Sequence, residues 1–257
     1  MFICTGKWHC SPFNNIIMIK AIIKRLIKKL PVAFTQNQRY DRQTIRVIRK
    51  VCKHTSNCID VGAHKGEVLD YMLRYAPEGT HYAFEPIPDL YAALREKYSD
   101  SSRCRVSDVA LSNVKGTASF NYVVSNPSYS GLVKRKYDRP HEEDRRITVA
   151  TDLLDNVLPS DIAIDLMKID VEGGELLVLE GAKTMITRCK PVIIFEHGLG
   201  ASDYYGATPE QVFLLLSGCG MKINTMKRWL AGEQAFTEQA FKKSYYNRVD
   251  YYFIAYP

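Results

Sequence analysis

The stretch that decides the fold is Cys58-Ile59-Asp60-Val61-Gly62-Ala63-His64-Lys65-Gly66. An apolar run contains an acid near its end, two glycines follow four positions apart, and a helical pattern comes next. This order is typical of a β-strand that leads through a tight turn into a helix. Gly62 and Gly66 suit a backbone that bends sharply and lets a ligand approach, and Asp60 would lie at the carboxyl end of the strand, where open α/β sheets bind ligands.

The residues that are missing from this turn narrow the choice of ligand. A dinucleotide turn needs Gly-x-Gly-x-x-Gly, but Ala63 and His64 follow Gly62, and no Gly-Lys-Ser/Thr closes a longer P-loop. An acid before the turn would repel a diphosphate and attract a cationic amino-acid group. The stretch therefore favours S-adenosylmethionine over NAD or ATP, with a tight turn that binds nothing as the alternative.

A second acid follows at a distance that supports this interpretation. Glu85 ends the apolar run Tyr82-Ala83-Phe84 and precedes Pro86, and it lies 19 residues after Gly66. A carboxylate about 20 residues beyond the turn is expected on the ribose hydroxyls of a bound nucleoside. The alternative is an ordinary surface glutamate.

Strand-like and helical patterns alternate along the chain, which predicts a mainly parallel sheet. The predicted strands are 58–60, 81–85, 103–109, 166–170 and 192–196, with further strand-like runs at 119–124, 147–150, 221–226 and 251–256. No helical pattern is evident between the last two, which therefore suggest an antiparallel pair at one edge. Residues 125–145 are polar and irregular, and such a long insertion is either a substrate lid or a solvated loop.

A second acid-rich stretch is Lys168-Ile169-Asp170-Val171-Glu172-Gly173-Gly174-Glu175. Asp170 ends a strand beside the one that contains Asp60, so it could bind a ligand's ammonium group or orient a substrate hydroxyl. Glu172 and Glu175 are also acids that a helix N-terminus simply tolerates.

The next strand ends in Glu196 and His197. A histidine there suits a general base, because its unperturbed pKa is near neutrality; the alternative is a hydrogen-bonded rim histidine. Asp170, Glu172, Glu196 and His197 could also form an oxygen-rich divalent metal site. Nothing in their spacing requires a metal, and we predict none.

These motifs together resemble the FkbM family of methyltransferases. The resemblance rests on Ile59–Gly66, Ala83–Pro86, Val109–Ser112, Met167–Glu175 with Leu179–Ala182, and the ending Tyr251–Ala255, and it covers about residues 50–256. It implies a class I Rossmann-like fold and O-methylation of a sugar or other small-molecule hydroxyl with S-adenosylmethionine. The predicted fold is then a doubly wound α/β domain with a mainly parallel seven-stranded sheet and an antiparallel C-terminal edge strand. The 125–145 insertion has no clear family match, so the acceptor stays open.

A set of site residues follows as a hypothesis. Asp60, Gly62 and Gly66, with Asp170, would hold the methionine part of the cofactor, and Glu85 the ribose. Asp108, Val109 and Ala110 would line the adenine edge. The predicted catalytic residues are His197, Asp170 and Glu196, with His197 or an acid near it as the proton acceptor.

The positive charge is concentrated near the N-terminus. The net charge is +7, and residues 1–30 contain six basic residues and no acid, so the remaining chain has 29 basic against 28 acidic residues. Residues 18–30 form a basic amphipathic pattern, too charged to span a bilayer, which either contacts an anionic membrane surface or packs on the domain. We predict an arm at 1–35, in which residues 1–17 show no pattern, and a methyltransferase domain at 36–257.

The cysteines and the near-neutral body limit the remaining classes. Seven scattered cysteines without a Cys-x-x-Cys pair indicate neither a zinc site nor a disulfide framework, so we expect a cytoplasmic setting, with peripheral contact at the inner membrane surface as an option. Three rivals stay open: an oxidoreductase with a degenerate dinucleotide turn, a nucleic-acid methyltransferase, and a membrane-associated binding protein without activity. The near-neutral body and the lack of an Asn-Pro-Pro-aromatic block after 166–170 count against nucleic acid.

Overall fold

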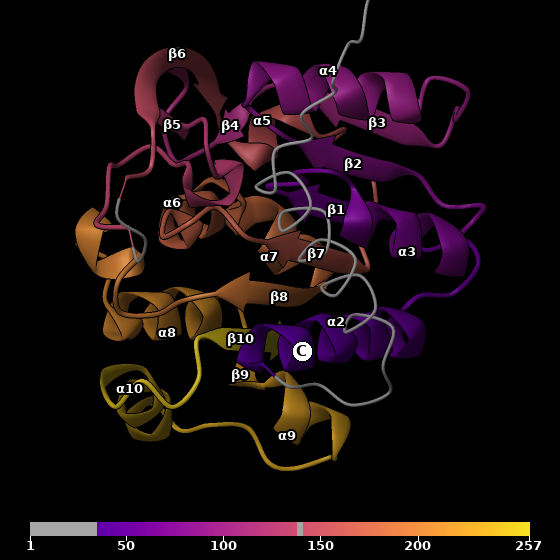
Figure 1. Ribbon diagram of the computed structural model, residues 1–257. Helices are drawn as coiled ribbons and strands as arrows, with labels where there is room; N and C mark the ends of the chain where they lie inside the picture. Colours follow the sequence, from indigo (N-terminus) through magenta and orange to yellow (C-terminus); the bar gives the residue numbers. More distant parts are fainter. Residues whose placement is uncertain (1–34, 138–140) are drawn as a thin grey trace, which may run out of the picture. The chain divides into compact units, whose positions relative to one another are not determined.

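Figure 1 shows the computed structural model of the 257-residue chain, which describes residues 35–137 and 141–257. The chain divides into two units, Met1–Arg42 and Gln43–Pro257. Residues 1–17 and the predicted amphipathic helix at 18–30 lie outside the described residues, and the predicted division at residue 35 stays a prediction. Within the described part of the chain, no helix combines the length and the apolarity needed to cross a membrane.

A seven-stranded sheet forms the centre of the second unit (Figure 1). Its strand order is β3-β2-β1-β7-β8-β10-β9. The strands are β1 (Cys58–Val61), β2 (His81–Phe84), β3 (Cys104–Ser107), β7 (Leu166–Ile169), β8 (Val192–Glu196), β9 (Lys222–Thr225) and β10 (Tyr252–Tyr256). The first five are mutually parallel. The predicted Rossmann-like, doubly wound α/β class is confirmed.

The antiparallel pair at the end of the chain is also present. β10 pairs antiparallel with both β8 and β9, so the C-terminal strand lies between them and β9 forms the outer edge. The expectation of no helix between these strands is wrong, because α9 (Met226–Leu230) and α10 (Glu238–Tyr246) lie there. Thr225 and Thr237 cap these two short helices with their side chains.

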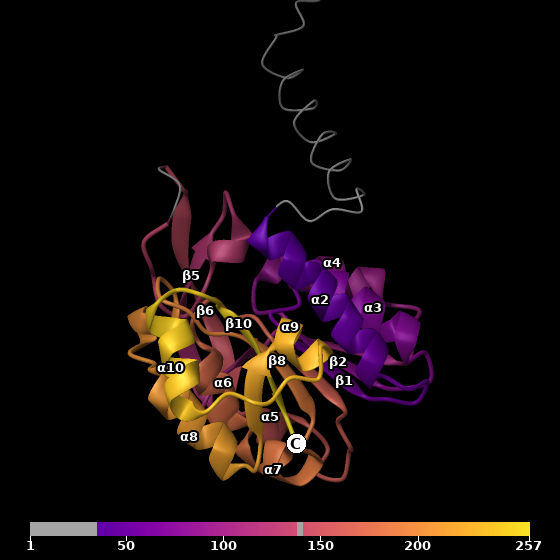
Figure 2. The same cartoon turned by 90° about the horizontal axis from the view of Figure 1, so that it is seen from below.

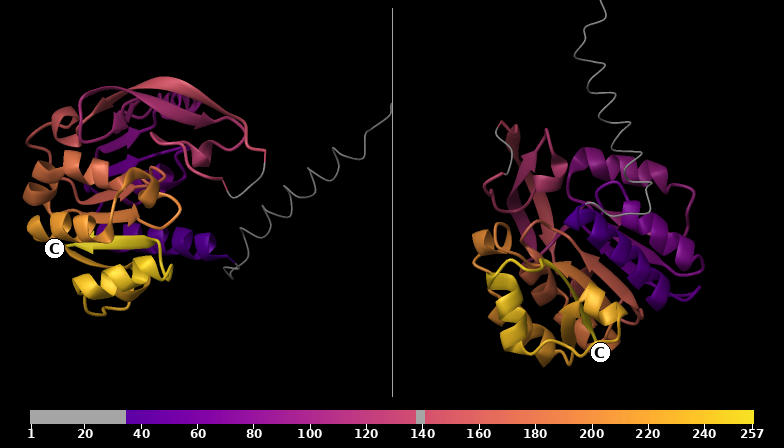
Figure 3. Two further views of the ribbon diagram at one scale, coloured as in Figure 1. Left: turned by 90° about the vertical axis from the view of Figure 1, so that its left-hand side faces the viewer. Right: turned by 60° about the horizontal axis from the view of Figure 1, so that its bottom comes forward.

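A second, three-stranded sheet has the order β4-β6-β5. It consists of β4 (Ala110–Leu111), β5 (Gly116–Val123) and β6 (Asp144–Asp152), and the β5–β6 hairpin arches beside the main sheet in Figure 3. β6 is longer than the predicted run because it pairs with β5 from Asp144 to Thr151. The insertion predicted to be irregular therefore contains regular structure among its described residues, namely a 3-10 turn at Pro127–Tyr129 and a bridge from Asn121 to Gly131.

Helices cover both faces of the main sheet (Figure 2). One face is covered by α5 (Leu154–Val157), α6 (Glu175–Gly181), α7 (Lys183–Cys189), α8 (Pro209–Gly218) and α10, whose apolar residues form one cluster with the sheet. α3 (Glu67–Tyr75) and α4 (Pro88–Lys97) lie on the opposite side, while α2 (Gln36–Val51) crosses the boundary between the two units.

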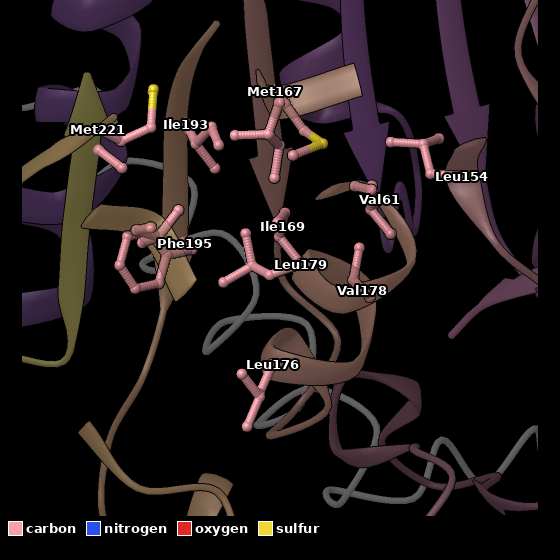
Figure 4. Close-up of a cluster of buried hydrophobic side chains, with 14 of the residues drawn as sticks. Val61, Leu154, Met167, Ile169, Leu176, Val178, Leu179, Ile193, Phe195 and Met221 are labelled. Carbon is pink, nitrogen blue, oxygen red and sulfur yellow. The ribbon is translucent and has the colours of Figure 1, made fainter. Parts of the chain in front are cut away.

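The apolar cluster fixes which way each strand residue points. Figure 4 shows Val61, Ile169 and Phe195 turned toward α6. Because side chains alternate between the faces of a strand, Asp60, Lys168 and Glu196 point to the opposite face. The burial of the apolar residues therefore brings a row of charged groups to the α3 side of the sheet.

Candidate functional site

The site lies where β1 and β7 end side by side. Asp60 pairs in register with Lys168, and the backbone N–H of Asp170 donates to the carbonyl of Val61 at 3.0 Å. Strands after β1 run outward in one direction and strands after β7 in the other, so this is the point of reversal at which open α/β sheets bind ligands. The carboxyl ends of β1, β2, β7 and β8 bring the predicted acids to one edge.

The glycine turn is shaped by protein contacts. Gly62 and Gly66 have φ values of 78° and 75°, which other residues rarely adopt. A Cβ at Gly62 would lie 1.9 Å from the carbonyl oxygen of Asp170, and one at Gly66 would lie 2.3 Å from the hydroxyl of Tyr98. The need for both glycines is therefore explained by how closely the turn approaches β7 and α4, whereas the sequence analysis assigned that space to a ligand.

Asp60 is the most unusual acid of the site. Its side chain is 1% exposed, and within the described residues neither carboxylate oxygen accepts a hydrogen bond of normal geometry, although the backbone N–H of Leu69 interacts with it weakly. Burial raises its pKa to about 6, the positive charge of Lys168 opposes this, and repulsion from Asp170 adds to it. A buried, unpartnered carboxylate is costly unless something donates to it, so Asp60 fits a ligand with a cationic or hydrogen-bond-donating group.

Glu85 connects the end of β2 to the glycine turn. One of its oxygens accepts from the backbone N–H of His64 at 2.8 Å and the other from that of Ile87 at 3.0 Å. Burial raises its pKa to about 7, and the two amide bonds oppose the rise. The structure thus adds a role in holding the turn, while the predicted contact with a ribose stays a prediction.

Asp170 is held by two donors. Its Oδ2 accepts from Lys168 Nζ at 2.8 Å and from the hydroxyl of Tyr252 at 2.7 Å. Burial opposes ionisation, but the charge of Lys168, these two hydrogen bonds and a further one from Glu196 lower the pKa of Asp170.

Glu196 responds in the opposite direction. Burial and repulsion, first from Asp170 and then from Glu172, raise its pKa well above the usual range. Two neighbouring carboxyl groups whose pKa values are pushed apart are typical of acid–base sites. Of the two, Asp170 loses its proton more readily and Glu196 keeps it to a higher pH.

The turn from β7 into α6 separates the roles of its two glutamates. Glu175 is fully buried and its Oε1 accepts from the amides of Val171 and Gly173 at 3.0 and 3.1 Å, so it holds the turn. Glu172 has a φ of 58° and forms an ion pair with Arg135. Burial, and then repulsion from Asp170, raise the pKa of Glu172 to about 8, while Arg135 opposes the rise.

The described part of the insertion before residue 138 contacts this turn through Arg135. Arg135 stacks over Tyr129, 5.1 Å from its ring centre, and Tyr129 stacks on Tyr137 with centroids 5.9 Å apart. The amide of Val133 donates to the hydroxyl of Tyr205 at 3.1 Å. We call residues 129–137 the strap. It lies against the acidic turn, as a lid would, but its role as a lid stays a prediction.

The structure does not bring His197 to the carboxylate cluster. Its ring is 0% exposed and stacks on Tyr245 and Phe241 of α10, with centroids 4.7 and 6.1 Å apart. Burial lowers its pKa to about 4, with a small opposing effect from Glu210. Because His197 follows Glu196 in the chain, alternation turns the two side chains to opposite faces of the sheet. Its predicted role as a base gains no support from this placement.

The predicted adenine edge follows β3. Asp108 is exposed, Val109 is half-buried and Ala110 is buried. The chain leaves the main sheet after Ser107, and Ala110 begins β4 in the second sheet, where it packs with Ile87 and Phe120. Its contact with an adenine stays a prediction. Within residues 35–137 and 141–257, no three His, Cys, Asp or Glu side chains are grouped so that they could hold a metal ion.

Comparison with known protein families identifies the family of this chain. The family described as "Methyltransferase FkbM domain" matches residues 60–223, which include the glycine turn, Glu85, Asp170 and Glu196. The chain belongs to the FkbM methyltransferase family. Its resemblance to that family is thereby confirmed.

Two curated relatives of this FkbM chain are methyltransferases by name. "Methyltransferase sdnD" of Sordaria araneosa is 29% identical over 152 residues, which cover 48% of this chain and 59% of the relative. "2-O-methyltransferase NoeI" of Sinorhizobium fredii is 25% identical over 197 residues, which cover 70% of this chain and 80% of the relative. The chain thus spans less than two thirds of the length of the first.

A solved structure is also similar. A methyltransferase FkbM from Methylobacillus flagellatus KT matches with a TM-score of 0.49 and 14% identity, covering 95% of this chain and 60% of that one.

Three residues of the site were not predicted from the sequence. Lys168 and Tyr252 both stand in motifs that resemble the FkbM family, yet nothing local showed that they meet at Asp170. Arg135 lies in a polar run, and its pairing with Glu172 joins segments that are 37 residues apart. A basic residue inside an apolar strand was the one available signal, and it pointed to Lys168.

Proposed function

We propose that this FkbM-family chain transfers a methyl group from S-adenosylmethionine to a hydroxyl group of a small molecule or glycan. The observation that carries the proposal is Asp60, a buried carboxylate at the point where the sheet reverses, to which no described residue donates a hydrogen bond of normal geometry. S-adenosylmethionine has an ammonium group, a sulfonium group and ribose hydroxyls, so it matches a crevice rich in acids.

The placement of the acids suggests which of them would hold which part of the cofactor. Asp60 and the turn from Gly62 to Gly66 would hold the methionine part, and Glu85 at the end of β2 would accept from the ribose. When bound, the cofactor supplies an already activated methyl group. The task left to the protein is to hold and orient the acceptor.

The arrangement of the acids favours Asp170 as the group that receives the acceptor's proton. Its carboxylate is kept ionised by Lys168 and Tyr252 and lies beside the protonated Glu196. A hydroxyl becomes strongly acidic as its oxygen forms a bond to carbon, so a carboxylate with a low pKa is a sufficient acceptor. Glu172 and the strap residue Arg135 border the same turn and would contact the acceptor.

The choice of a hydroxyl acceptor rests on relatives as well as on geometry. The name of NoeI describes a 2-O-methyltransferase, and two tyrosines and an arginine of the strap lie next to the acidic turn. These side chains suit a polar, ring-containing acceptor such as a sugar. The acceptor's identity is part of the proposal.

The test is transfer of isotope-labelled methyl from S-adenosylmethionine to a panel of glycans, small alcohols and nucleic acids. We expect label on a hydroxyl acceptor, at least 100-fold less transfer in Asp170→Asn, and unchanged transfer in Asp100→Asn, a change at an exposed site. Label on nucleic acid alone would favour the rival class, and full activity of Asp170→Asn would remove Asp170 from its role.

A further inference from the structure

A lysine lies inside the central strand of the sheet. Lys168 belongs to β7, which has β1 on one side and β8 on the other, and it is only 7% exposed. Among the described residues it is the only lysine or arginine in the buried class. Lysines are rarely buried to this degree without a partner, because an ammonium group is costly to remove from water. The position therefore needs an explanation.

The partners of Lys168 are carboxyl groups from three strands. Its Nζ donates to Asp170 Oδ2 at 2.8 Å, its Cα is in register with that of Asp60 on β1, and Glu196 lies at the end of β8. Burial disfavours the ammonium, but attraction, first to Asp170 and then to Asp60, outweighs it and raises the pKa of Lys168. The hydroxyl of Tyr252, from β10, donates to the same Asp170 oxygen at 2.7 Å.

This geometry favours ionisation of one of the three acids over the other two. Three carboxyl groups in a poorly hydrated space cannot all be ionised, because each negative charge repels the others. A direct ammonium contact and a second donor both act on Asp170, whereas within the described residues no hydrogen bond of normal geometry reaches Asp60. Asp170 is therefore the acid of the three that loses its proton most readily.

We propose that Lys168 is a positioning residue which, together with Tyr252, fixes Asp170 as the ionised acceptor of the crevice. What Asp170 then accepts rests on the proposed function, but its charge is a property of the protein without any ligand. The charged and titratable groups that act on Asp170 and Lys168 come from every neighbouring element: Asp60 from β1, His64 from the glycine turn, Glu196 from β8, Tyr252 from β10, Glu172 and Glu175 from the following turn, and Arg135 from the strap.

The direct test is a carboxyl ¹³C NMR titration of protein labelled at aspartate, with the Asp170 signal assigned by its loss in Asp170→Asn. We expect Lys168→Met to move the titration midpoint of Asp170 upward by about one to three pH units, the range for loss of an opposite charge at this distance. Lys168→Arg should keep the midpoint near that of the unchanged protein, and Tyr252→Phe should move it upward by less than Lys168→Met does.

An unchanged midpoint in Lys168→Met, or an equal displacement in Lys168→Arg, would overturn the proposal. If Lys168→Met does not fold, Tyr252→Phe and Lys168→Arg decide, because no upward shift in the first or a large upward shift in the second contradicts it. Lys115→Met, at a side chain that is 73% exposed, is the control and should leave the midpoint unchanged.

A calorimetric arm separates this proposal from the proposed function. We expect the affinity of Lys168→Met for S-adenosylmethionine to fall several-fold more than that of the unchanged protein between pH 8 and pH 5, because Asp170 then takes up a proton at a higher pH. If the unchanged protein binds no S-adenosylmethionine, the proposed function fails while the NMR titration still judges Lys168. If it binds and Lys168→Met shows the same pH dependence, a role for Asp170 in binding is contradicted.

Discussion

Replacing His197 by phenylalanine separates a buried packing residue from a catalytic base. The imidazole is 0% exposed, no described residue forms a hydrogen bond with either ring nitrogen, and the ring stacks 4.7 Å from that of Tyr245. Phenylalanine keeps the stacked ring and removes the two polar atoms. Leucine, which is closer to histidine in volume, serves as the second variant.

The expected effect depends on pH, and its sign follows from proton binding. Burial lowers the pKa of His197 from 6.5 to about 4. Between these values the unfolded chain binds a proton that the folded chain does not, so the folded state loses stability as the pH falls from 6.5 to 4. At about 1.4 kcal/mol per pH unit, the loss is roughly 2 kcal/mol by pH 5.

Both variants remove this linkage. At pH 7, where the histidine is neutral in both states, removing two unpaired buried nitrogens is worth about 1 kcal/mol, less any cost of repacking. The difference in free energy of unfolding between variant and unchanged protein should then grow by about 2 kcal/mol between pH 7 and pH 5.

Urea unfolding at pH 7, 6 and 5 measures these differences, and methyl transfer at pH 7.5 completes the assay. We expect activity within threefold of the unchanged protein. A parallel pH dependence of stability in variant and unchanged protein would refute the placement of His197 in a dry aromatic environment. A loss of turnover of 100-fold or more, in the range for a general base, would restore the catalytic role.

Three further changes test the turn, the buried acid and the strap. Asp60→Asn should stabilise the free protein by about 3 kcal/mol at pH 8 in urea unfolding, because a pKa raised from 3.8 to about 6 costs stability as the pH rises through 6. The gain should vanish below pH 4. A variant that is less stable than the unchanged protein at pH 8 would contradict this prediction. Gly62→Ala should lower the free energy of unfolding by more than about 2 kcal/mol, since strain at φ 78° adds to the clash with Asp170. The control Gly232→Ala, with φ 75° and open space around the glycine, should lower it by only about 1 kcal/mol. Equal losses in the two variants would show that the clash is relieved. Arg135→Ala should lower kcat/KM for the acceptor about tenfold and leave cofactor affinity within twofold, and a reversed pattern in steady-state kinetics and calorimetry would place the strap at the cofactor instead.

Features encoded within a few residues were predictable from the sequence. An acid followed by two glycines marks a strand, a turn and a helix, and the acids at 60, 85, 170 and 196 follow apolar runs that end at the same edge. The parallel sheet follows because the strands alternate with helices. These predictions needed only local patterns and the rule that parallel strands end together.

The remaining features depend on contacts between distant segments. The helices α9 and α10 are short and have weak apolar patterns, so the sequence signal for them is small even though a threonine cap begins each one. β10 inserts between β8 and β9 through pairings that no local pattern encodes.

His197 is different, because its placement could have been read from the sequence. Phe195 lies in the core, and a residue two positions later points to the same face. The near-neutral pKa of a free histidine outweighed that signal in the sequence analysis.

The central claim is that the crevice at β1 and β7 binds S-adenosylmethionine. The most direct measurement is calorimetric titration of the protein with S-adenosylmethionine, with NAD as the control ligand, repeated on Asp60→Asn and Glu85→Gln. We predict saturable binding of S-adenosylmethionine alone, weakened at least tenfold in each variant, while Asp100→Asn binds as the unchanged protein does. Absence of binding, a preference for NAD, or full affinity in both variants would contradict the account.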